Sequence, residues 1–330
     1  MTPITLLSEM PMSLSRPWFK GQAVKYLDKV LGFIRGDQIG GSKVVQYNLT
    51  SGLTQLGQSF KLNPPAYLVT PLVGVLSNTD ALRWAIIAKR QGKIRYLVAG
   101  PNLVVTPQEQ NGIICASEID LVVTPSRWVS DHYLSMAPML AGKLVEWPVG
   151  VDTEFWAPDP TISRQDRAGG WLVYDKTQSG GSVERNMVVE ALSQKGEHVT
   201  WIVYGKYKPE EYRKKLQSAK AMIVLSPSES QGIAMFEAWA CDTPTLVWDR
   251  KMMEYKGMIF KSPSVSSSPY LSNESGRSFQ NAENFLHSLI EFEKCLDNYI
   301  PRDYILRNYT LRKAAENYIG LFKKGNIFNE

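Results

Sequence analysis

The sequence predicts an α/β protein with two domains, each built on a mostly parallel sheet with helices on both faces. Short apolar runs alternate with segments of helical periodicity along most of the 330 residues. A stretch dense in proline and glycine, residues 148–158, interrupts this alternation near its midpoint and is typical of a domain boundary. With 44% hydrophobic residues, the chain is long enough for each half to bury a core of its own.

The first domain is expected to span residues 1–150. A Gly-Gly turn at 40–41 leads into a helix whose apolar residues recur every four positions from Val45 to Leu53, and Gly57 ends it. Residues 1–28 are assigned to no element, and their Trp18-Phe19 pair either packs on this domain or forms an interfacial aromatic–basic patch. The expected strands are 29–34, 72–76, 94–98, 119–123 and 144–147, and the remaining helices are 80–90 and 127–135.

The second domain is expected to span residues 151–310, followed by a C-terminal segment, 311–330. Pro301 should end the long helix that precedes it, and the serine-rich residues 265–270 should form a loop. The expected strands are 171–174, 199–204, 221–225 and 245–248, and the expected helices are 182–195, 209–220, 232–241, 282–299 and 311–324.

Composition excludes several classes of protein. The sequence contains no run of about 18 apolar residues, so no transmembrane helix is predicted. No basic residue precedes the apolar part of the N-terminus, which is therefore unlike a secretory signal. Three widely spaced cysteines give neither a disulfide framework nor a metal-ligand spacing, which favours a reducing cytoplasm. The net charge of +5 suits anionic ligands or an anionic membrane surface, but no nucleic-acid-binding motif accompanies it.

The most informative stretch is the strand–turn–helix–strand unit at residues 221–248. Two carboxylates, Glu229 and Glu237, lie eight positions apart, one in the turn and one two helical turns later. Free N–H groups and the positive end of the helix dipole make the start of this helix a ready phosphate site. The residues expected to line that site are Ser230, Gln231, Gly232 and Ile233.

This stretch resembles the sugar-nucleotide motif of retaining GT-B glycosyltransferases of the family 4 type, in which two glutamates are separated by seven residues and an Ala-x-Ala-Cys-Gly-x-Pro run follows. Here Ser230-Gln231 replace the usual Gly-Phe, and Asp242 replaces a glycine at a position where a left-handed residue is common. Residues 148–158 are similar to the family's interdomain connection, and residues 121–128 to a segment near the end of its first domain. The resemblance implies two Rossmann-like domains facing a cleft, a final helix that packs back on the first domain, and closure by hinge motion near 148–158.

The resemblance also implies a site. Glu237 would accept hydrogen bonds from the donor ribose, and Glu229 would lie by the donor sugar at the reacting centre. Lys176 would be the cation that stabilises the departing diphosphate, so Lys176 and Glu229 are the expected catalytic residues, with no metal and no cofactor. Further donor contacts are expected from Arg185 of the second domain, from Tyr207 near the nucleobase, and from Gly41 and Asn102 of the first domain.

Each assignment has a plainer alternative. Lys176, Arg185 and Glu237 could be solvated surface charges, Glu229 a helix cap, and Tyr207 an ordinary core or surface aromatic. None of the three histidines fits the histidine that the family often has beside the donor sugar, and Asn102 stands in that loop instead.

Taken together, the sequence predicts metal-independent transfer of a sugar from a nucleotide-diphosphate donor to a hydroxyl of a glycan or glycolipid, with retention of configuration. The protein is expected in the cytoplasm, either free or in peripheral contact with the inner face of a membrane, and without nucleic-acid partners. Two rivals stay open: a non-catalytic protein that binds sugar nucleotides or glycans on the same fold, and a sugar-nucleotide epimerase with a GT-B fold.

Overall fold

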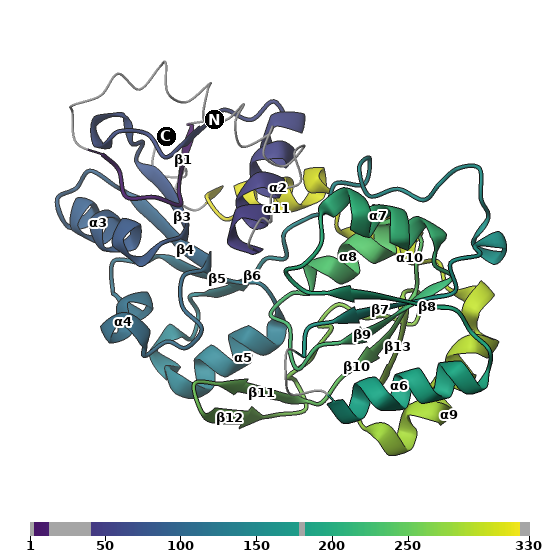
Figure 1. The fold of residues 1–330 in the computed structure, drawn as a ribbon. Helices are drawn as coiled ribbons and strands as arrows, with labels where there is room; N and C mark the ends of the chain where they lie inside the picture. The colour runs from purple at the N-terminus through teal and green to yellow at the C-terminus, as the bar shows by residue number, and fades with distance from the viewer. Residues whose placement is uncertain (1–2, 13–40, 178–181, 324–330) are drawn as a thin grey trace. The chain divides into compact units, whose positions relative to one another are not determined.

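The computed structural model describes residues 3–12, 41–177 and 182–323. The predicted strand at 29–34, the Trp18-Phe19 pair and Gly40 lie outside these residues. Contacts between Cα atoms divide the described chain into two compact units (Figure 1). Unit 1 comprises residues 3–12, 41–150 and 311–323, and unit 2 comprises 151–177 and 182–310.

Unit 1 contains a six-stranded sheet in which every pair of neighbours is parallel, in the order β2-β1-β3-β4-β5-β6. Its strands are β1 (Ile4–Leu7), β2 (Phe60–Leu62), β3 (Leu72–Ser77), β4 (Tyr96–Asn102), β5 (Leu121–Thr124) and β6 (Leu144–Glu146). Its helices are α2 (Gly41–Gln55), α3 (Thr79–Arg90), α4 (Glu109–Gly112), α5 (Arg127–Met136) and α11 (Leu311–Gly320), with 3-10 turns at Ala66–Leu68, Ile113–Cys115 and Pro138–Leu140.

Helix α11, from the far end of the chain, packs tightly against α2 in unit 1. A Cβ built on Gly52 of α2 would lie 2.2 Å from the carbonyl oxygen of Leu311, so only glycine allows this approach. The indole Nε1 of Trp147, which follows β6, donates to the carbonyl oxygen of Ala314 at 2.8 Å, and its ring meets Tyr318 edge-on at 4.9 Å. Residues 311–323 are therefore part of the core of unit 1.

Unit 2 contains a five-stranded parallel sheet in the order β13-β10-β9-β7-β8 and a separate antiparallel pair, β11-β12. Its strands are β7 (Trp171–Asp175), β8 (Val199–Val203), β9 (Ala221–Leu225), β10 (Thr245–Trp248), β11 (Met252–Tyr255), β12 (Met258–Lys261) and β13 (Gly276–Phe279). Its helices are α6 (Ser182–Gln194), α7 (Pro209–Ser218), α8 (Ile233–Ala240), α9 (Ala282–Lys294) and α10 (Pro301–Asn308), with 3-10 turns at Arg164–Asp166 and Leu296–Asn298.

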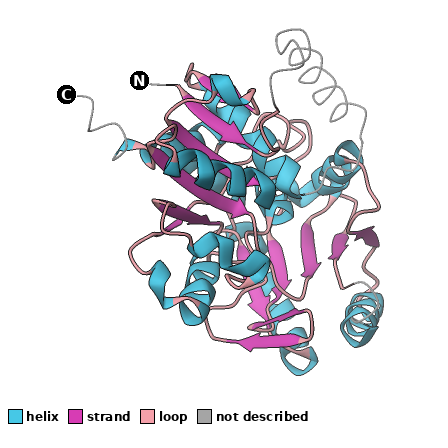
Figure 2. Cartoon of the chain, turned by 90° about the vertical axis from the view of Figure 1, so that its left-hand side faces the viewer, coloured by secondary structure: helices cyan, strands magenta, loops and turns pink. Residues whose placement is uncertain are grey.

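The strand β9 lies at the centre of two hydrophobic clusters in unit 2. Met222 and Val224 pack into one cluster with α7 and α8, whereas Ala221, Ile223 and Leu225 pack into the other with α6 and α9. A strand buried on both faces is what a parallel sheet with helices on each side requires. Strands and helices are combined in this way in both units (Figure 2), so the predicted α/β class with two parallel sheets is confirmed.

Several predicted elements need correction. The strands β1, β2, β11, β12 and β13, each of only three or four residues, were not predicted. The helix predicted at 282–299 ends earlier, at Lys294, and Pro301 begins a separate helix, α10, because its ring suits the first turn of a helix. The predicted loop at 100–102 is the end of β4, where the pairing with β3 shifts register between Val75 and Ser77.

Within the described residues, none of the helices has both the length and the apolar character needed to cross a lipid bilayer.

Candidate functional site

The candidate site of unit 2 lies at the carboxyl edge of its sheet, where β7 and β9 end side by side. Asp175 of β7 is paired with Leu225 of β9, and the N–H of Lys176 donates to the carbonyl oxygen of Leu225 at 2.8 Å. The segments that leave these two strands, beginning at Lys176 and Ser226, therefore start next to each other.

Lys176 and Glu229 form a bidentate ion pair at this edge. The Nζ atom of Lys176 lies 2.9 Å from each carboxylate oxygen of Glu229. Ser226 Oγ donates to the same carboxylate at 2.9 Å, and the ammonium lies 4.7 Å from the centre of the Tyr204 ring. The side chains are only 29% and 13% exposed, so the pair is partly withdrawn from water. The structure thus brings together the two residues that the sequence nominated as catalytic.

The turn that carries Glu229 is held by a serine-rich loop, residues 262–268. The N–H of Glu229 donates to the carbonyl oxygen of Ser266 at 3.1 Å, and Ser267 Oγ donates to the carbonyl oxygen of Ser226 at 2.8 Å. Buried Asp249, just after β10, accepts hydrogen bonds from Ser266 Oγ and from the Ser267 N–H at 2.9 and 3.0 Å. Asp249 was not among the predicted site residues, although a carboxylate at the end of a buried strand is a usable signal.

Gly232 sets the start of α8. Its φ of +85° is left-handed, a conformation that strains any residue with a side chain, so the turn favours glycine. No side chain caps the helix, and within the described part of unit 2 the N–H groups of Ile233 and Ala234 have no acceptor. Two donors at the positive end of a helix can bind an anion.

The neighbouring residues Ser230 and Gln231 differ in exposure. Ser230 is exposed at the surface of the turn, whereas Gln231 is buried. Both residues lie just before the start of α8, where they were expected to line a phosphate site.

Glu237 lies one helical turn after Ile233, on the same side of α8. Within the described residues, no side chain or backbone donor binds its carboxylate. Burial raises the pKa of this carboxyl group to about 8. A desolvated carboxyl group with no partner among the described residues can bind hydroxyl groups supplied by a ligand.

Tyr207 belongs to an aromatic group beside Glu237. Its ring centre lies 5.0 Å from that of Tyr212 and 6.2 Å from that of Tyr174, and its hydroxyl is 3.5 Å from the Tyr174 hydroxyl. Burial, with a smaller contribution from the Glu237 carboxylate, raises the pKa of Tyr207. Tyr207 is therefore a partly buried aromatic at the margin of the core and also a neighbour of the carboxylate.

Arg185 is committed to another contact. Its Nε lies 3.0 Å from Oδ2 of buried Asp175, and its guanidinium stacks over the Trp201 ring at 5.4 Å. The other oxygen of Asp175 accepts from both the N–H and the hydroxyl of Thr177. Asp175, the last residue of β7, thus neutralises Arg185, and Lys176 follows it directly in the chain.

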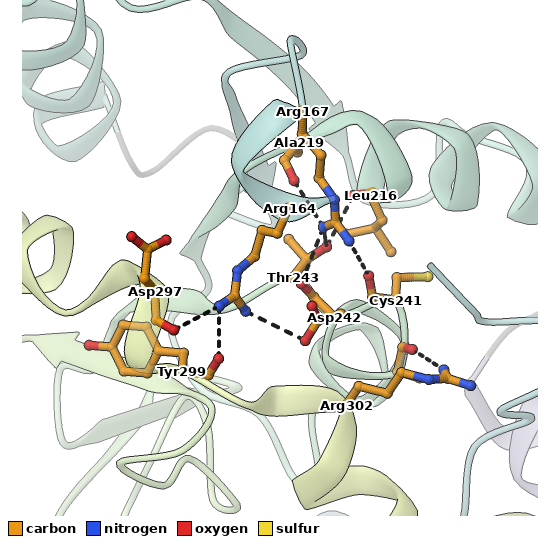
Figure 3. Close-up of polar contacts among 11 residues, drawn as sticks. Arg164, Arg167, Leu216, Ala219, Cys241, Asp242, Thr243, Asp297, Tyr299 and Arg302 are labelled. Carbon is orange, nitrogen blue, oxygen red and sulfur yellow. Dashed lines mark hydrogen bonds and ion pairs between the residues drawn. The ribbon is translucent and has the colours of Figure 1, made fainter. Parts of the chain in front are cut away.

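Three arginines hold the opposite end of α8 (Figure 3). Buried Arg167 donates to the carbonyl oxygens of Cys241, Asp242 and Ala219 and to the Thr243 hydroxyl, all at 3.1–3.2 Å. Arg302 donates to the Ala240 carbonyl oxygen, and Arg164 lies 3.5 Å from the Asp242 carboxylate. Cations at a helix C-terminus satisfy its free carbonyl groups and oppose its negative dipole end, so these contacts fix α8, which carries Gly232 and Glu237, along its axis.

Asp242 adopts the left-handed conformation expected for its place in the motif, with a φ of +57°.

The two residues nominated in unit 1 differ in character. Gly41 is the exposed first residue of α2, and a Cβ there would meet nothing within 4 Å, so packing gives no reason for glycine. Asn102 ends β4, and within the described residues its buried Nδ2 has no hydrogen-bond partner. A buried amide donor without an acceptor is open to a ligand.

The described residues contain no group of three histidine, cysteine or acidic side chains arranged to hold a metal ion.

Comparisons with known proteins identify the fold. No protein-family model and no curated protein matches the sequence. Among solved structures, a glycosyltransferase from Rickettsia africae ESF-5 is similar over 98% of this chain and 99% of its own, with a TM-score of 0.59 and 14% identity. The lipopolysaccharide outer core galactosyltransferase WaaB is similar over 98% and 100%, with a TM-score of 0.56 and 12% identity. Anabaena HepE, solved in complex with UDP and glucose, is similar over 98% and 100%, with a TM-score of 0.52 and 10% identity. The chain therefore has the GT-B architecture.

Proposed function

We propose that the protein is a glycosyltransferase that moves a sugar from a nucleotide-diphosphate donor to a hydroxyl acceptor, with retention of configuration and without a metal. The observation that carries this proposal is the carboxyl edge of the unit 2 sheet. There a cation follows β7, and an uncapped helix start and a carboxyl group without a partner among the described residues follow the adjacent strand β9. The similar structures support it, since WaaB is named as a galactosyltransferase and HepE was solved with UDP and glucose.

In this proposal the free N–H groups of Ile233 and Ala234 bind the donor diphosphate. Lys176 adds a charge-assisted hydrogen bond. Its ammonium has three hydrogens, of which the Glu229 carboxylate takes two. The third can reach a phosphate oxygen without breaking the ion pair, and it stabilises the charge that develops on the leaving diphosphate.

Glu237 binds the ribose. A vicinal diol presents two O–H donors, and an ionised carboxylate presents two acceptors, so each group satisfies the other. Donor binding then favours the ionised form of a group whose pKa is raised in the free protein. Tyr207 lies next to this carboxylate and is the proposed neighbour of the nucleobase.

Glu229 lies at the proposed reacting centre, oriented by Ser226 and by its pairing with Lys176. A carboxylate already neutralised by an ammonium is better suited to positioning the donor sugar than to attacking it. Gly41 and Asn102 are the proposed contributions of unit 1 to the donor, and Arg185 acts through Asp175, which fixes the end of β7.

The test is a donor screen followed by turnover. UDP, GDP and ADP, each free and as sugar conjugates, are titrated against the protein, and a nucleotide that binds the folded state raises its melting temperature. The donor that binds is then incubated with glycan and glycolipid acceptors, and the anomeric configuration of the product is read by NMR, with and without EDTA. Glu237→Ala should abolish donor binding, whereas a matched change at exposed Glu283 on α9 should leave it unaltered.

Three results would contradict the proposal. A donor that binds equally well to Glu237→Ala would place the ribose elsewhere. Sugar-nucleotide binding without transfer or hydrolysis would favour the non-catalytic rival. Conversion of one sugar nucleotide to another without acceptor would favour the epimerase.

A further inference from the structure

Residues 250–261 form a hairpin that belongs to neither large sheet. Among the residues that the structure describes, its strands β11 and β12 pair only with each other, in an antiparallel register that sets Tyr255 opposite Met258. The two-residue turn, Lys256-Gly257, has φ values of +48° and +78°, which match the tight turn that suits the twist of paired strands. The hairpin is therefore a defined projection from unit 2.

The base of the hairpin is fixed next to the candidate site. Met253 is buried, and Lys251 Nζ lies 2.7 Å from Oδ2 of Asp249, the same carboxylate that holds Ser266 and Ser267 beneath the Glu229 turn. The hairpin leaves from the end of β10 and returns into residues 262–268. It thus extends from the edge of the sheet at which the donor is proposed to bind.

The far end of the hairpin exposes apolar side chains. Met258 is 48% exposed and Ile259 is 60% exposed. Consecutive strand residues point to opposite faces, so these two side chains present apolar surface on both sides of the hairpin just after its turn. An isolated pair of strands gains nothing in water from such exposure.

Basic residues surround this apolar end. Four of the five charged residues in 250–261 are basic, and the single acid is Glu254. Lys256 lies in the turn and Lys261 at the end of β12, both exposed, so that the apolar pair lies between two cations along the chain. Apolar side chains flanked by lysines match the boundary between anionic lipid headgroups and acyl chains.

We propose that the 250–261 hairpin docks on an anionic membrane surface, with Met258 and Ile259 entering the interface and Lys256 and Lys261 binding lipid headgroups. The docking itself does not depend on the enzymatic activity. Its consequence, which rests on the proposed function, is that the acceptor is a lipid-linked glycan, because the hairpin would hold the edge that carries Glu229 beside the membrane.

The experiment is co-sedimentation of the full chain with vesicles at 50 mM salt. One vesicle is pure phosphatidylcholine, and the other contains 30% phosphatidylglycerol. Met258→Ser/Ile259→Ser removes the apolar contribution, and Lys256→Gln/Lys261→Gln removes the charge. The matched controls are Leu286→Ser/Ile290→Ser, which alters apolar side chains of similar exposure on α9, and Lys208→Gln/Lys214→Gln, which alters exposed lysines at and within α7.

We expect the wild-type protein to bind the anionic vesicles and not the neutral ones. The lysine pair should weaken binding about 25-fold, since each lysine near an anionic surface contributes about a factor of five. The apolar pair should weaken it about tenfold, and the two controls should bind as wild type does. Donor binding, measured by thermal shift, should be unaltered in every variant, which separates a failure of this proposal from a failure of the proposed function.

Failure of the wild-type protein to bind anionic vesicles would overturn the proposal, as would equal losses in the hairpin and control variants. Loss of a dimer in the hairpin variants, measured by light scattering without any vesicle binding, would assign the surface to a second copy of the chain and would also overturn it.

Discussion

The carboxyl group of Glu237, which has no partner among the described residues, should make the stability of the protein fall as pH rises, and Glu237→Gln should remove that fall. Below pH 4.5 the group is protonated in both the folded and the unfolded chain. Between 4.5 and about 8 the folded protein keeps a proton that the unfolded chain has lost, so the free energy of unfolding decreases with pH across this window. Above about pH 8 both states are ionised, and the cost stays constant.

The magnitude follows from the shift. A rise from 4.5 to about 8 corresponds to at most about 5 kcal/mol at 1.36 kcal/mol per unit. Because the residue is not fully buried by surface area, we expect about 2–4 kcal/mol. Glutamine keeps the shape and cannot ionise, so the stability advantage of the variant should be smallest at pH 5 and largest at pH 8.5.

Urea unfolding of both proteins at pH 5.0, 6.5 and 8.5 measures the difference. Subtracting one curve from the other cancels the other groups that titrate in the same range. A difference that does not change with pH would refute the reasoning, because it would mean that Glu237 has the same proton affinity in both states. With a saturating donor, the wild-type deficit at pH 8.5 should shrink, since the ribose hydroxyls would satisfy the carboxylate.

Three further substitutions test the geometry of unit 2. Lys176→Met should cost about 1–3 kcal/mol, because it leaves the partly buried carboxylate of Glu229 without its cation; in a double-mutant cycle with Glu229→Gln by urea unfolding, strictly additive losses would disprove the coupling. Gly232→Ala should cost about 1–3 kcal/mol, because it forces a residue with a side chain into a left-handed φ; a melting temperature unchanged by calorimetry would mean that the turn can relax. Arg167→Met should cost about 3 kcal/mol or more, because several buried acceptors at the end of α8 lose their donor; equal hydrogen-exchange protection of α8 in variant and wild type would count against its role there.

The sequence predicted the elements around the candidate site most closely. The strands β9 and β10 have the predicted bounds, and α8 differs by one residue at each end. These segments are apolar runs bounded by turn residues, so the sequence pattern alone indicates the same buried elements that the structure contains. The positions of Lys176 and Ser226 after adjacent strand ends also made the approach of Lys176 to Glu229 foreseeable.

The remaining parts depend on contacts distant in sequence. The strand β1 has only four residues, and its pairing with β2 and β3 is what defines it. The strand β13 reads Gly-Arg-Ser-Phe, a polar sequence that becomes a strand only beside β10. The contacts of Asp249 with the serine loop and of Arg167 with α8 likewise join segments 17 or more positions apart, which no local pattern reveals.

The packing of α11 into unit 1 has a consequence for synthesis of the protein. The ribosome makes residues 41–150 early and residues 311–320 only after all of unit 2 has been made. Until then the surface of α2 around Gly52 and the indole of Trp147 lack the helix that covers them. Unit 2 is continuous in the chain from 151 to 310 and can therefore be completed first, although domains generally fold in order from the N-terminus. During that interval the surface of unit 1 that α11 covers is exposed to water. A chain released by a ribosome that stalls before residue 311 would keep this surface exposed, and we expect it to aggregate.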